Sequence, residues 1–468
     1  MIELTPILNT KSEKPIYIQL TNYIKKEIIA GSIRPKEKLP SKRKLSQHLG
    51  ISLNTIQASY DQLCAEGYVR SIQRKGYFVT DLDNSIFLFH NHPHPLQTNN
   101  RKVESTNIKV DYNVGRVDLE KFPYTLWRKL TIQSLYEDQG ELLNFGHPQG
   151  EISLRELIVK HLFASRGVRC SADQVVIGAG TQQLISQLCT IIGINHVFAF
   201  ENPGFNGTMA VIKNQVNKTA AIPVDEDGIN MQLLRQSGAS VVYVTPSHQF
   251  PLGMVMPISR RIDLLKWAHE NKAYIIEDDY DGEFRYKGKP IPSLQGLDNY
   301  DNVIYLGSFS KSLIPSIRIS YMILPPHLIE RYKEYFSIYK QAASRLHQDT
   351  LFRFMKEGYW DSHLNKMRTL YRKKQNTLIT SITNDFGNQV NIIGEKSGLH
   401  IILEVSNEMV EEELVTSALE VGVKVYPLST YYDESTKYEE SKVILGYGGL
   451  SEAEIIEGIK LLKGAWKL

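Results

Sequence analysis

Apolar residues near the N-terminus recur three or four positions apart, which is the spacing of one face of a helix. Ile24 and Ile28 mark such a face in PIYIQLTNYIKKEIIAGSI, and Leu45 and Leu49 mark another in LPSKRKLSQHLG. The glycine that ends this second segment predicts a tight turn into a third helix, ISLNTIQASYDQLCAEG. Two strand-like pieces, GYVRSI and GYFVT, follow with a basic connection between them. This order predicts a winged helix-turn-helix domain over residues 1–81.

Residues 82–108 show no such period. The stretch NHPHPLQTNNRKVESTN is polar and holds two prolines, so we predict a flexible linker between two domains. Its histidines, His90, His92 and His94, could bind a metal ion. No acidic residue or cysteine lies close to them in the sequence, so a solvated linker is the favoured interpretation.

From residue 109 onward, short apolar runs alternate with helical segments. The runs QVVIGAG, HVFAFEN, SVVYVTPS, AYIIEDDY and NVIYLGSFS predict buried strands. Short buried strands separated by helices are typical of a parallel sheet with helices on both faces. Near the C-terminus, GLHIILEV and KVILGYGG predict a smaller α+β subdomain, which we place from about residue 340. The predicted fold class is α/β, with an N-terminal winged helix and a large domain over residues 109–468.

The charge separates the two predicted domains. Residues 1–80 hold 13 Lys/Arg and 6 Asp/Glu, whereas the rest of the 468 residues hold 41 and 45. A basic domain on a mildly acidic body suggests a polyanion partner for the first part, although charge alone fits a solvated basic face equally well. No apolar run approaches the ~20 residues of a membrane span and no signal-peptide pattern is present, so we expect a cytoplasmic protein without a membrane partner.

The first domain carries the residue types of a DNA reader. The second helix of a helix-turn-helix reads base edges in the major groove with small polar and amide side chains, while basic residues on the preceding helix and at a hairpin tip contact the backbone or the minor groove. The stretch PSKRKLSQHLGISLNTIQASYDQLCAEGYV…RKGYFV resembles the winged helix of GntR-type bacterial regulators over about 65 residues, which implies a double-stranded DNA operator. A winged helix that contacts only protein is the alternative. The candidate DNA-binding residues are Ser41, Arg43, Lys44, Ser52, Asn54, Thr55, Gln57, Arg74 and Lys75.

Two motifs of the large domain lie at predicted strand ends, where open α/β sheets bind ligands. Lys311 lies in the serine-rich turn SFSKS, and such a lysine could form a Schiff base, although most lysines in such strings are simply solvated. Asp278 ends the strand YIIEDDY, where a buried carboxylate could face a protonated pyridine ring and Tyr280 could bond its hydroxyl. The same acidic cluster, with Asp281 and Glu283, could also hold a metal ion.

A glycine-rich turn and an aromatic residue complete the candidate site. In GAGTQQ, between a strand and a helix, the backbone N–H groups and the Thr181 hydroxyl could bind an anion, or the turn could be only a helix cap. Phe205, in ENPGF, could stack on a ring or belong to the core. Pyridoxal phosphate needs such a set: a lysine, an acid, a stacking ring and a phosphate cradle. The candidate cofactor residues are Gly180, Thr181, Gln182, Phe205, Asp278, Tyr280, Ser308, Ser310, Lys311 and Arg318.

The order of these motifs resembles that of fold-type-I aminotransferases: the anion turn, ENPGF, TPSHQFPLG, the acidic strand end and SFSK with a trailing arginine. Joined to the GntR-type module, the chain is similar to the MocR/GabR family of regulators. The resemblance implies that Lys311 carries the cofactor aldimine, Asp278 faces the pyridine nitrogen and Tyr280 the ring oxygen. It also implies a homodimer, often head-to-tail. We expect no resident metal.

The chain departs from this pattern where an arginine fork usually binds the substrate carboxylate. Gly449, in LGYGGL, occupies the usual place, and no arginine follows Phe205 closely. The effector is therefore a non-standard one, such as pyridoxal phosphate itself or a larger amino compound, or another residue, Arg116 or Arg345, takes over the role.

Three functions remain open at this stage. The favoured one is a cofactor-dependent, ligand-responsive transcriptional regulator with little or no steady turnover. The alternative is a working aminotransferase with an accessory DNA-binding domain. A third possibility is a dimerisation platform without cofactor, which the intact lysine and acid argue against.

Overall fold

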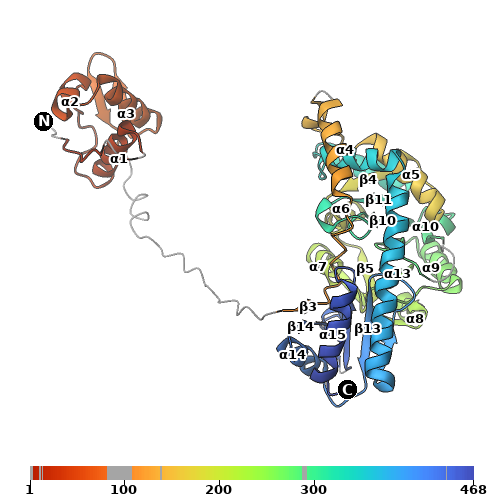
Figure 1. The fold of residues 1–468 in the computed structure, drawn as a ribbon. Coiled ribbons are helices and arrows are strands. Elements are labelled where there is room, and N and C mark those ends of the chain that lie inside the picture. The colour runs from red at the N-terminus through yellow and green to blue at the C-terminus, as the bar shows by residue number, and fades with distance from the viewer. Residues whose placement is uncertain are drawn as a thin grey trace. The chain divides into compact units, whose positions relative to one another are not determined.

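The computed structural model describes residues 4–9, 12, 14–81, 108–137, 140–286, 292–438 and 440–468, and it divides into two compact units, Met1–Glu104 and Ser105–Leu468 (Figure 1). Except for Ile108, the predicted linker with its three histidines lies outside the described residues. Among the described residues, no helix is long and apolar enough to cross a membrane.

The N-terminal unit is the predicted winged helix. It contains α1 (Ile16–Ile29), α2 (Lys42–Leu49), α3 (Leu53–Ala65), β1 (Val69–Ile72) and β2 (Gly76–Val79), and β1 and β2 pair antiparallel. The helices close around one apolar core because the residues at helical spacing, among them Ile24, Ile28 and Leu45, are buried. Gly50 ends α2 with φ of 65°, a conformation that favours glycine and lets α3 turn sharply away.

The second unit is built on an eight-stranded sheet, in the spatial order β4 (Val175–Gly178), β11 (Ser320–Ile323), β10 (Val303–Ser308), β9 (Tyr274–Asp279), β8 (Val241–Val244), β5 (Val197–Asn202), β6 (Lys218–Asp225) and β7 (Gly228–Ile229). The five predicted strands are all present. The sheet is mixed rather than purely parallel, because β11 runs antiparallel to both β10 and β4. Only residues 309–319 join β10 to β11, which is too short for the crossover that a parallel pair needs.

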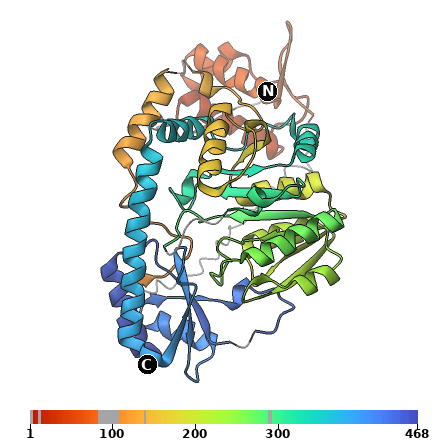
Figure 2. The same ribbon diagram turned by 90° about the vertical axis from the view of Figure 1, so that its right-hand side faces the viewer.

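Helices cover both faces of this sheet, so the strands from β4 to β5 in the spatial order are buried on both sides (Figure 2). One face packs against α6 (Thr181–Ile192), α7 (Asn206–Gln215) and α11 (Pro326–Phe336). The opposite face packs against α5 (Ile152–Arg166), α12 (Arg345–Lys356) and α9 (Ile258–Asn271). The remaining helices of this layer are α4 (Tyr124–Glu137), α8 (Met231–Gln236) and α10 (Leu294–Leu297), with short 3-10 turns at Glu141–Leu143, Ala172–Gln174 and Pro315–Ile317.

The C-terminal layer contains a four-stranded antiparallel sheet in the order β12 (Val390–Ile393), β13 (His400–Val405), β16 (Lys442–Gly446) and β15 (Tyr426–Pro427). A second small sheet pairs β14 (Val423–Lys424) in parallel with β3 (Val110–Asp111). The helices α13 (Tyr359–Phe386), α14 (Glu411–Glu420) and α15 (Glu452–Ala465) complete it, with 3-10 turns at Gly387–Gln389 and Ser429–Tyr431.

The packing draws a different boundary from the one expected near residue 340. Leu351 and Phe354 of α12 are buried in the large-domain core. Tyr112 and Val117, more than 200 residues earlier, are buried in the C-terminal core. The small layer therefore combines the chain after the start of α13 with a segment that precedes α4, because β3 pairs with β14.

Candidate functional site

A cavity of about 310 Å³ opens at the carboxyl ends of β8, β9 and β10. The size is that of a small-molecule or cofactor site. The predicted residues other than Gly180 line it, and Gly180 borders it through Arg318. The lining residues are Val114, Gly115, Thr181, Gln182, Phe205, Tyr243, Thr245, Phe250, Asp278, Tyr280, Ser308, Ser310, Lys311 and Arg318.

Lys311 follows β10 and reaches the cavity from the turn that returns the chain to β11. Its ammonium group donates a hydrogen bond to the Val114 carbonyl oxygen. Burial lowers the pKa of Lys311 to about 8, and the carboxylate of Asp281 opposes this effect. The neutral amine is the nucleophile in carbonyl chemistry, so this environment makes Lys311 suited to bind an aldehyde covalently.

Asp278, at the end of β9, presents a half-satisfied carboxyl group to the same cavity. The Tyr243 hydroxyl donates to its Oδ2 at 2.5 Å, whereas its buried Oδ1 has no hydrogen-bond partner among the described residues. Burial raises the pKa of Asp278 to about 7, and the Tyr243 hydrogen bond opposes that rise. A buried acceptor without a donor is costly, so a cationic N–H group placed against Oδ1 would stabilise the carboxylate.

An anion cradle lies at the N-terminus of α6. Thr181 is the first residue of this helix, whose free N–H groups favour negative charge. Ser308 and Ser310 face each other, with their hydroxyl oxygens 3.1 Å apart. Arg318 donates to the Ala179 carbonyl oxygen at 3.2 Å, and it lies so close to Gly180 that a Cβ there would be 1.9 Å from its Nη2.

Aromatic side chains form the walls between these polar ends. Phe205 and Phe250 meet edge to face, with ring centroids 5.5 Å apart. The Tyr280 hydroxyl lies 2.9 Å from Nδ1 of His248. Gln182 does not point only at the cavity, since its amide donates to the Gly207 carbonyl oxygen at 3.1 Å. The slot is apolar on its faces, acidic at one end and anion-binding at the other, and the residues present fit pyridoxal phosphate.

Five lining residues carried no signal that singled them out in the sequence. Val114 and Gly115 come from the segment that packs with the C-terminal layer, far from the motifs in the chain. Tyr243 lies in a strand that the sequence marks only as apolar, and Thr245 and Phe250 lie in the TPSHQFPLG stretch, where neither was singled out. A tyrosine inside an otherwise aliphatic strand is the one feature that could have indicated a polar contact there.

A buried carboxylate shapes the loop behind Phe250. Glu201, at the end of β5, accepts hydrogen bonds from the backbone N–H of Thr245 at 3.0 Å and from its hydroxyl at 2.7 Å. Gln249 donates to the Pro203 carbonyl oxygen at 2.9 Å. Burial raises the pKa of Glu201 to about 7. These contacts hold the backbone of the loop that carries Phe250, and so they position its ring in the wall of the cavity.

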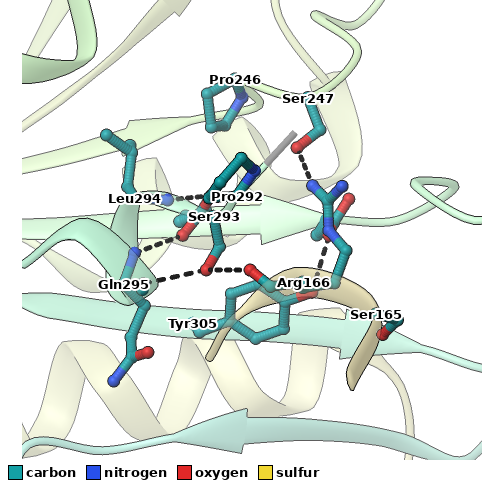
Figure 3. Close-up of polar contacts among 12 residues, drawn as sticks. Ser165, Arg166, Pro246, Ser247, Pro292, Ser293, Leu294, Gln295 and Tyr305 are labelled. Carbon is teal, nitrogen blue, oxygen red and sulfur yellow. Dashed lines mark hydrogen bonds and ion pairs between the residues drawn. The ribbon is translucent and has the colours of Figure 1, made fainter. Parts of the chain in front are cut away.

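The acidic cluster splits between the two faces of the sheet, because neighbouring residues of a strand point in opposite directions. Asp278 faces the cavity, while Asp279 accepts from Arg166 at 2.6 Å and from the Tyr305 hydroxyl at 2.7 Å. Arg166 also donates to the hydroxyl of Ser247 (Figure 3). Within the part of the chain that the structure describes, no group of three His, Cys, Asp or Glu residues could hold a metal ion.

Neither candidate replacement for the missing arginine fork lines the cavity. Arg116 packs over Gly449, where a Cβ would lie 2.6 Å from the Cβ of Arg116, and its guanidinium binds Asp111 at 2.9 Å. Arg345 binds Glu151 at 2.7 Å. Both guanidinium groups have acidic partners, so neither is directed at a ligand in this cavity.

The two predicted serines of the DNA-binding surface are helix caps. Ser41 accepts from the backbone N–H of Lys44 at 3.3 Å, and Ser52 accepts from that of Thr55 at 3.1 Å. Caps of this kind set where a helix begins and how its first turn is presented. Asn54 is exposed in the first turn of α3.

The remaining predicted residues of this surface differ in their surroundings. Gln57 is engaged within its own domain, because it donates to Asp61 at 2.6 Å and accepts from the Lys42 ammonium group. Arg43 is exposed on α2, and Arg74 and Lys75 are exposed in the turn between β1 and β2. Arg74 has a φ of 62° there.

Comparisons with known proteins agree with both halves of the chain. Residues 16–79 match the bacterial regulatory proteins of the gntR family, and residues 107–438 match aminotransferase class I and II. The chain is 45% identical to the HTH-type transcriptional regulator YdeL of Bacillus subtilis (strain 168) over 100% of both chains. It is 30% identical to the probable rhizopine catabolism regulatory protein MocR of Rhizobium meliloti, over 98% of this chain and 95% of that one. The kynurenine aminotransferase of Pyrococcus horikoshii, solved in complex with PMP, superposes with a TM-score of 0.71 at 25% identity, over 78% of this chain and 92% of that one.

The fold and the comparisons together define a transcription regulator in which a winged helix is joined to a fold-type-I aminotransferase domain that binds pyridoxal phosphate. More particularly, the chain belongs to the MocR-type family of GntR regulators. The predicted fold class and cofactor are thereby confirmed.

Proposed function

We propose that this regulator senses an effector in the cavity around Lys311 and that the state of the cavity determines how the winged helix binds its operator. The observation that carries the proposal is the pairing of a buried lysine with an acid whose Oδ1 lacks a donor, in one cavity. Both features are costly in an empty scaffold and useful when a cationic ring and an aldehyde are bound.

Each part of the cavity has a role toward the cofactor in this proposal. Pyridoxal phosphate supplies an aldehyde for covalent attachment and a ring that withdraws electrons. Lys311 provides the amine, and Asp278 holds the ring nitrogen in its protonated form. Tyr280 donates to the ring oxygen, and Phe205 packs on the ring. Gly180, Thr181, Gln182, Ser308, Ser310 and Arg318 hold the phosphate end.

We infer the class of effector from the missing arginine that usually binds a substrate carboxylate. Among the described residues, Arg318 is the arginine that lines the cavity, and we assign Arg318 to the phosphate end. Gly449 leaves the usual position of the fork to the stem of Arg116, and that arginine is paired with Asp111. A site without the fork favours a ligand that is not held by an α-carboxylate. We propose the cofactor itself or a larger amino compound. A relative 27% identical to this chain is named a pyridoxine biosynthesis transcriptional regulator. The missing fork also predicts little or no steady transamination.

The operator contacts are divided by residue type. We propose that Asn54, Thr55 and Gln57 face base edges in the major groove, and that Ser41 and Ser52 set the helix starts. Arg43, Lys44, Arg74 and Lys75 then contact the backbone or the minor groove. Gln57 must leave Asp61 to reach a base. We further propose a cytoplasmic homodimer of head-to-tail arrangement, without a resident metal.

The first experiment is the near-visible absorption spectrum of the purified chain with pyridoxal phosphate, before and after borohydride reduction, with peptide mapping. We expect a yellow band that reduction abolishes, with the cofactor fixed to Lys311. Lys311→Ala should lose the band and the label and keep its fold, whereas Lys333→Ala, an exposed lysine outside the cavity, should keep both. An unlabelled wild-type chain, or a label elsewhere, would remove Lys311 from the site.

A further inference from the structure

His248 lies directly behind Tyr280 and is 2% exposed. Its Nδ1 is 2.9 Å from Oδ2 of Asp281 and 2.9 Å from the Tyr280 hydroxyl oxygen. The His248 and Tyr280 rings stack, with centroids 5.9 Å apart and planes 30° apart. Asp281, His248 and Tyr280 therefore form a chain of contacts that ends at the cofactor cavity, which Tyr280 lines and His248 does not.

Two glycines leave the space that the His248 ring fills. A Cβ on Gly398 would lie 2.0 Å from Cε1 of His248, and a Cβ on Gly253 would lie 3.3 Å from its Nε2. Both glycines have positive φ, 77° and 74°, so the backbone there also favours glycine. The residues on either side of His248 are held as well, since Ser247 accepts from Arg166 and Gln249 donates to the Pro203 carbonyl oxygen. These surroundings hold the His248 ring in place.

The charged and titratable groups around His248 come from several elements. Asp281 and Tyr280 follow β9, and His400 of β13 has its ring centroid 5.2 Å from that of His248. Burial and the neighbouring His248 lower the pKa of His400 to about 3. His400 is therefore neutral, and its Nε2 lies 2.8 Å from the Pro251 carbonyl oxygen, which only a protonated Nε2 can bond. Arg166, Arg285 and Ser397 line a second, small cavity together with His248 and Asp281.

The two contacts of Nδ1 decide which tautomer His248 adopts. A carboxylate only accepts hydrogen bonds, so Asp281 requires a proton on Nδ1. With a proton on Nδ1, the ring cannot accept the hydroxyl proton of Tyr280. The Tyr280 oxygen then accepts from the shared Nδ1–H, and its own proton must point to another acceptor. Tyr280 lines the cofactor cavity, so an acceptor bound there can take this proton.

We propose that Asp281 and His248 position the hydroxyl proton of Tyr280 toward the cofactor cavity, so that Tyr280 donates to the ring oxygen of the bound cofactor. His248 and Asp281 are positioning residues, since they act through Tyr280. The inference rests on the proposed function, because the acceptor is the cofactor attached to Lys311. If Nδ1 carried no proton, the Tyr280 hydroxyl would donate to His248 and could not donate to a ligand in the cavity.

The test is a pH titration of the near-visible band of the full chain loaded with pyridoxal phosphate. A donor to the ring oxygen stabilises its negative charge and lowers the proton affinity of the lysine–cofactor linkage. Tyr280→Phe should therefore raise the pH of the spectral transition by about one unit, which is a tenfold change in proton affinity. His248→Phe, which keeps a stacked ring, should raise this pH by less. Asp281→Asn permits the other tautomer but also removes a charge that favours protonation at Lys311, so its effect through Tyr280 is the difference between its shifts in the wild-type and Tyr280→Phe backgrounds.

The control variants separate positioning from packing. His248→Asn places an amide N–H near the position of Nδ1–H and should titrate like the wild type. In the Tyr280→Phe background, His248→Phe should add no further shift, because a residue that acts through another has no effect once that residue's group is absent. A wild-type transition in His248→Phe, an additive shift in the double variant, or equal shifts of Asp281→Asn in the wild-type and Tyr280→Phe backgrounds would overturn the inference. If borohydride leaves Lys311 of the wild type unlabelled, the proposed function fails and the inference fails with it. If Lys311 is labelled normally but the variants titrate like the wild type, the inference is wrong and the proposed function stands.

Discussion

At the residue scale, the buried carboxyl group of Asp278 lowers the free energy of unfolding at neutral pH. Its Oδ1 is buried without a donor, and burial raises its pKa from 3.8 to about 7. Below pH 3.8 the folded and unfolded chains are both protonated at this group, so it costs nothing. Between pH 3.8 and 7 the unfolded chain ionises first, and the folded state loses stability as the pH rises. Above pH 7 the cost is complete.

Asp278→Asn removes this cost, because the amide is uncharged at every pH. We expect the ligand-free variant to unfold about 2–6 °C higher than the wild type at pH 8, with a smaller difference at pH 5. The same variant should bind pyridoxal phosphate at least tenfold more weakly, since it cannot hold a protonated ring nitrogen. Calorimetry at the two pH values and a cofactor titration measure both effects. A pH-independent change in unfolding temperature would contradict the account of Asp278.

Gly180 offers a second test at this scale. It has a φ of 102°, and a Cβ there would collide with the guanidinium group of Arg318. We expect Gly180→Ala to displace Arg318 from the anion cradle and weaken cofactor binding about tenfold or more. Gly358→Ala is the matched control, because Gly358 also has a positive φ, 78°, but no atom within 4 Å of its Cβ position. Equal losses of cofactor affinity in both variants would mean that backbone strain, not Arg318, is responsible.

At the scale of elements, the sequence predicted what local spacing encodes. The three N-terminal helices, the hairpin and the five strands that precede the site motifs follow from apolar periodicity and glycine turns. β11 was not predicted, because its direction depends on the length of the return from β10 rather than on its own composition. The cavity wall at Val114 was not predicted either, since β3 pairs with β14 more than 300 residues later and no local pattern records that contact.

The winged helix supports a prediction at the same scale. Arg43 is exposed on α2, the helix that precedes the recognition helix. If it contacts a phosphate, Arg43→Ala should weaken binding to all DNA sequences and reduce the slope of log affinity against log salt by about 0.9. Lys460→Ala, an exposed basic residue on α15, serves as the control with the same charge change. Titrations at several salt concentrations decide the point, and an unchanged slope would exclude Arg43 from the interface.

At the scale of the whole molecule, apolar side chains are exposed on one part of the second unit. Tyr136, Leu143 and Phe145 are 81%, 76% and 75% exposed, and Lys340 lies over the Phe145 ring at 5.1 Å. The neighbouring Ile338 is 83% exposed. Exposed apolar clusters of this kind mark protein interfaces, which supports the proposed homodimer.

Phe145→Glu should therefore weaken self-association by tenfold or more, because it places a charge in the apolar contact that the proposed dimer would bury. Phe163→Glu, on α5 and 64% exposed, is the control for a surface phenylalanine elsewhere. Sedimentation velocity over a range of concentrations measures both. A dimer that tolerates Phe145→Glu as well as Phe163→Glu would place the interface on another face.

The helix α13 also has a mechanical consequence. Its 28 residues contain no glycine or proline, and it begins in the large-domain core at Trp360 and ends in the C-terminal core at Phe386 (Figure 1). At 1.5 Å per residue it is a stiff strut, meaning a rigid helix about 42 Å long, and it contains no glycine or proline at which it could kink. The wall at Val114 follows the core that the far end of the strut enters, while Lys311 belongs to the sheet near its beginning. If the cavity opens or closes, α13 must therefore tilt as one rigid rod. A shift of about an ångström beside the cofactor then corresponds to a larger displacement at the far end of the helix.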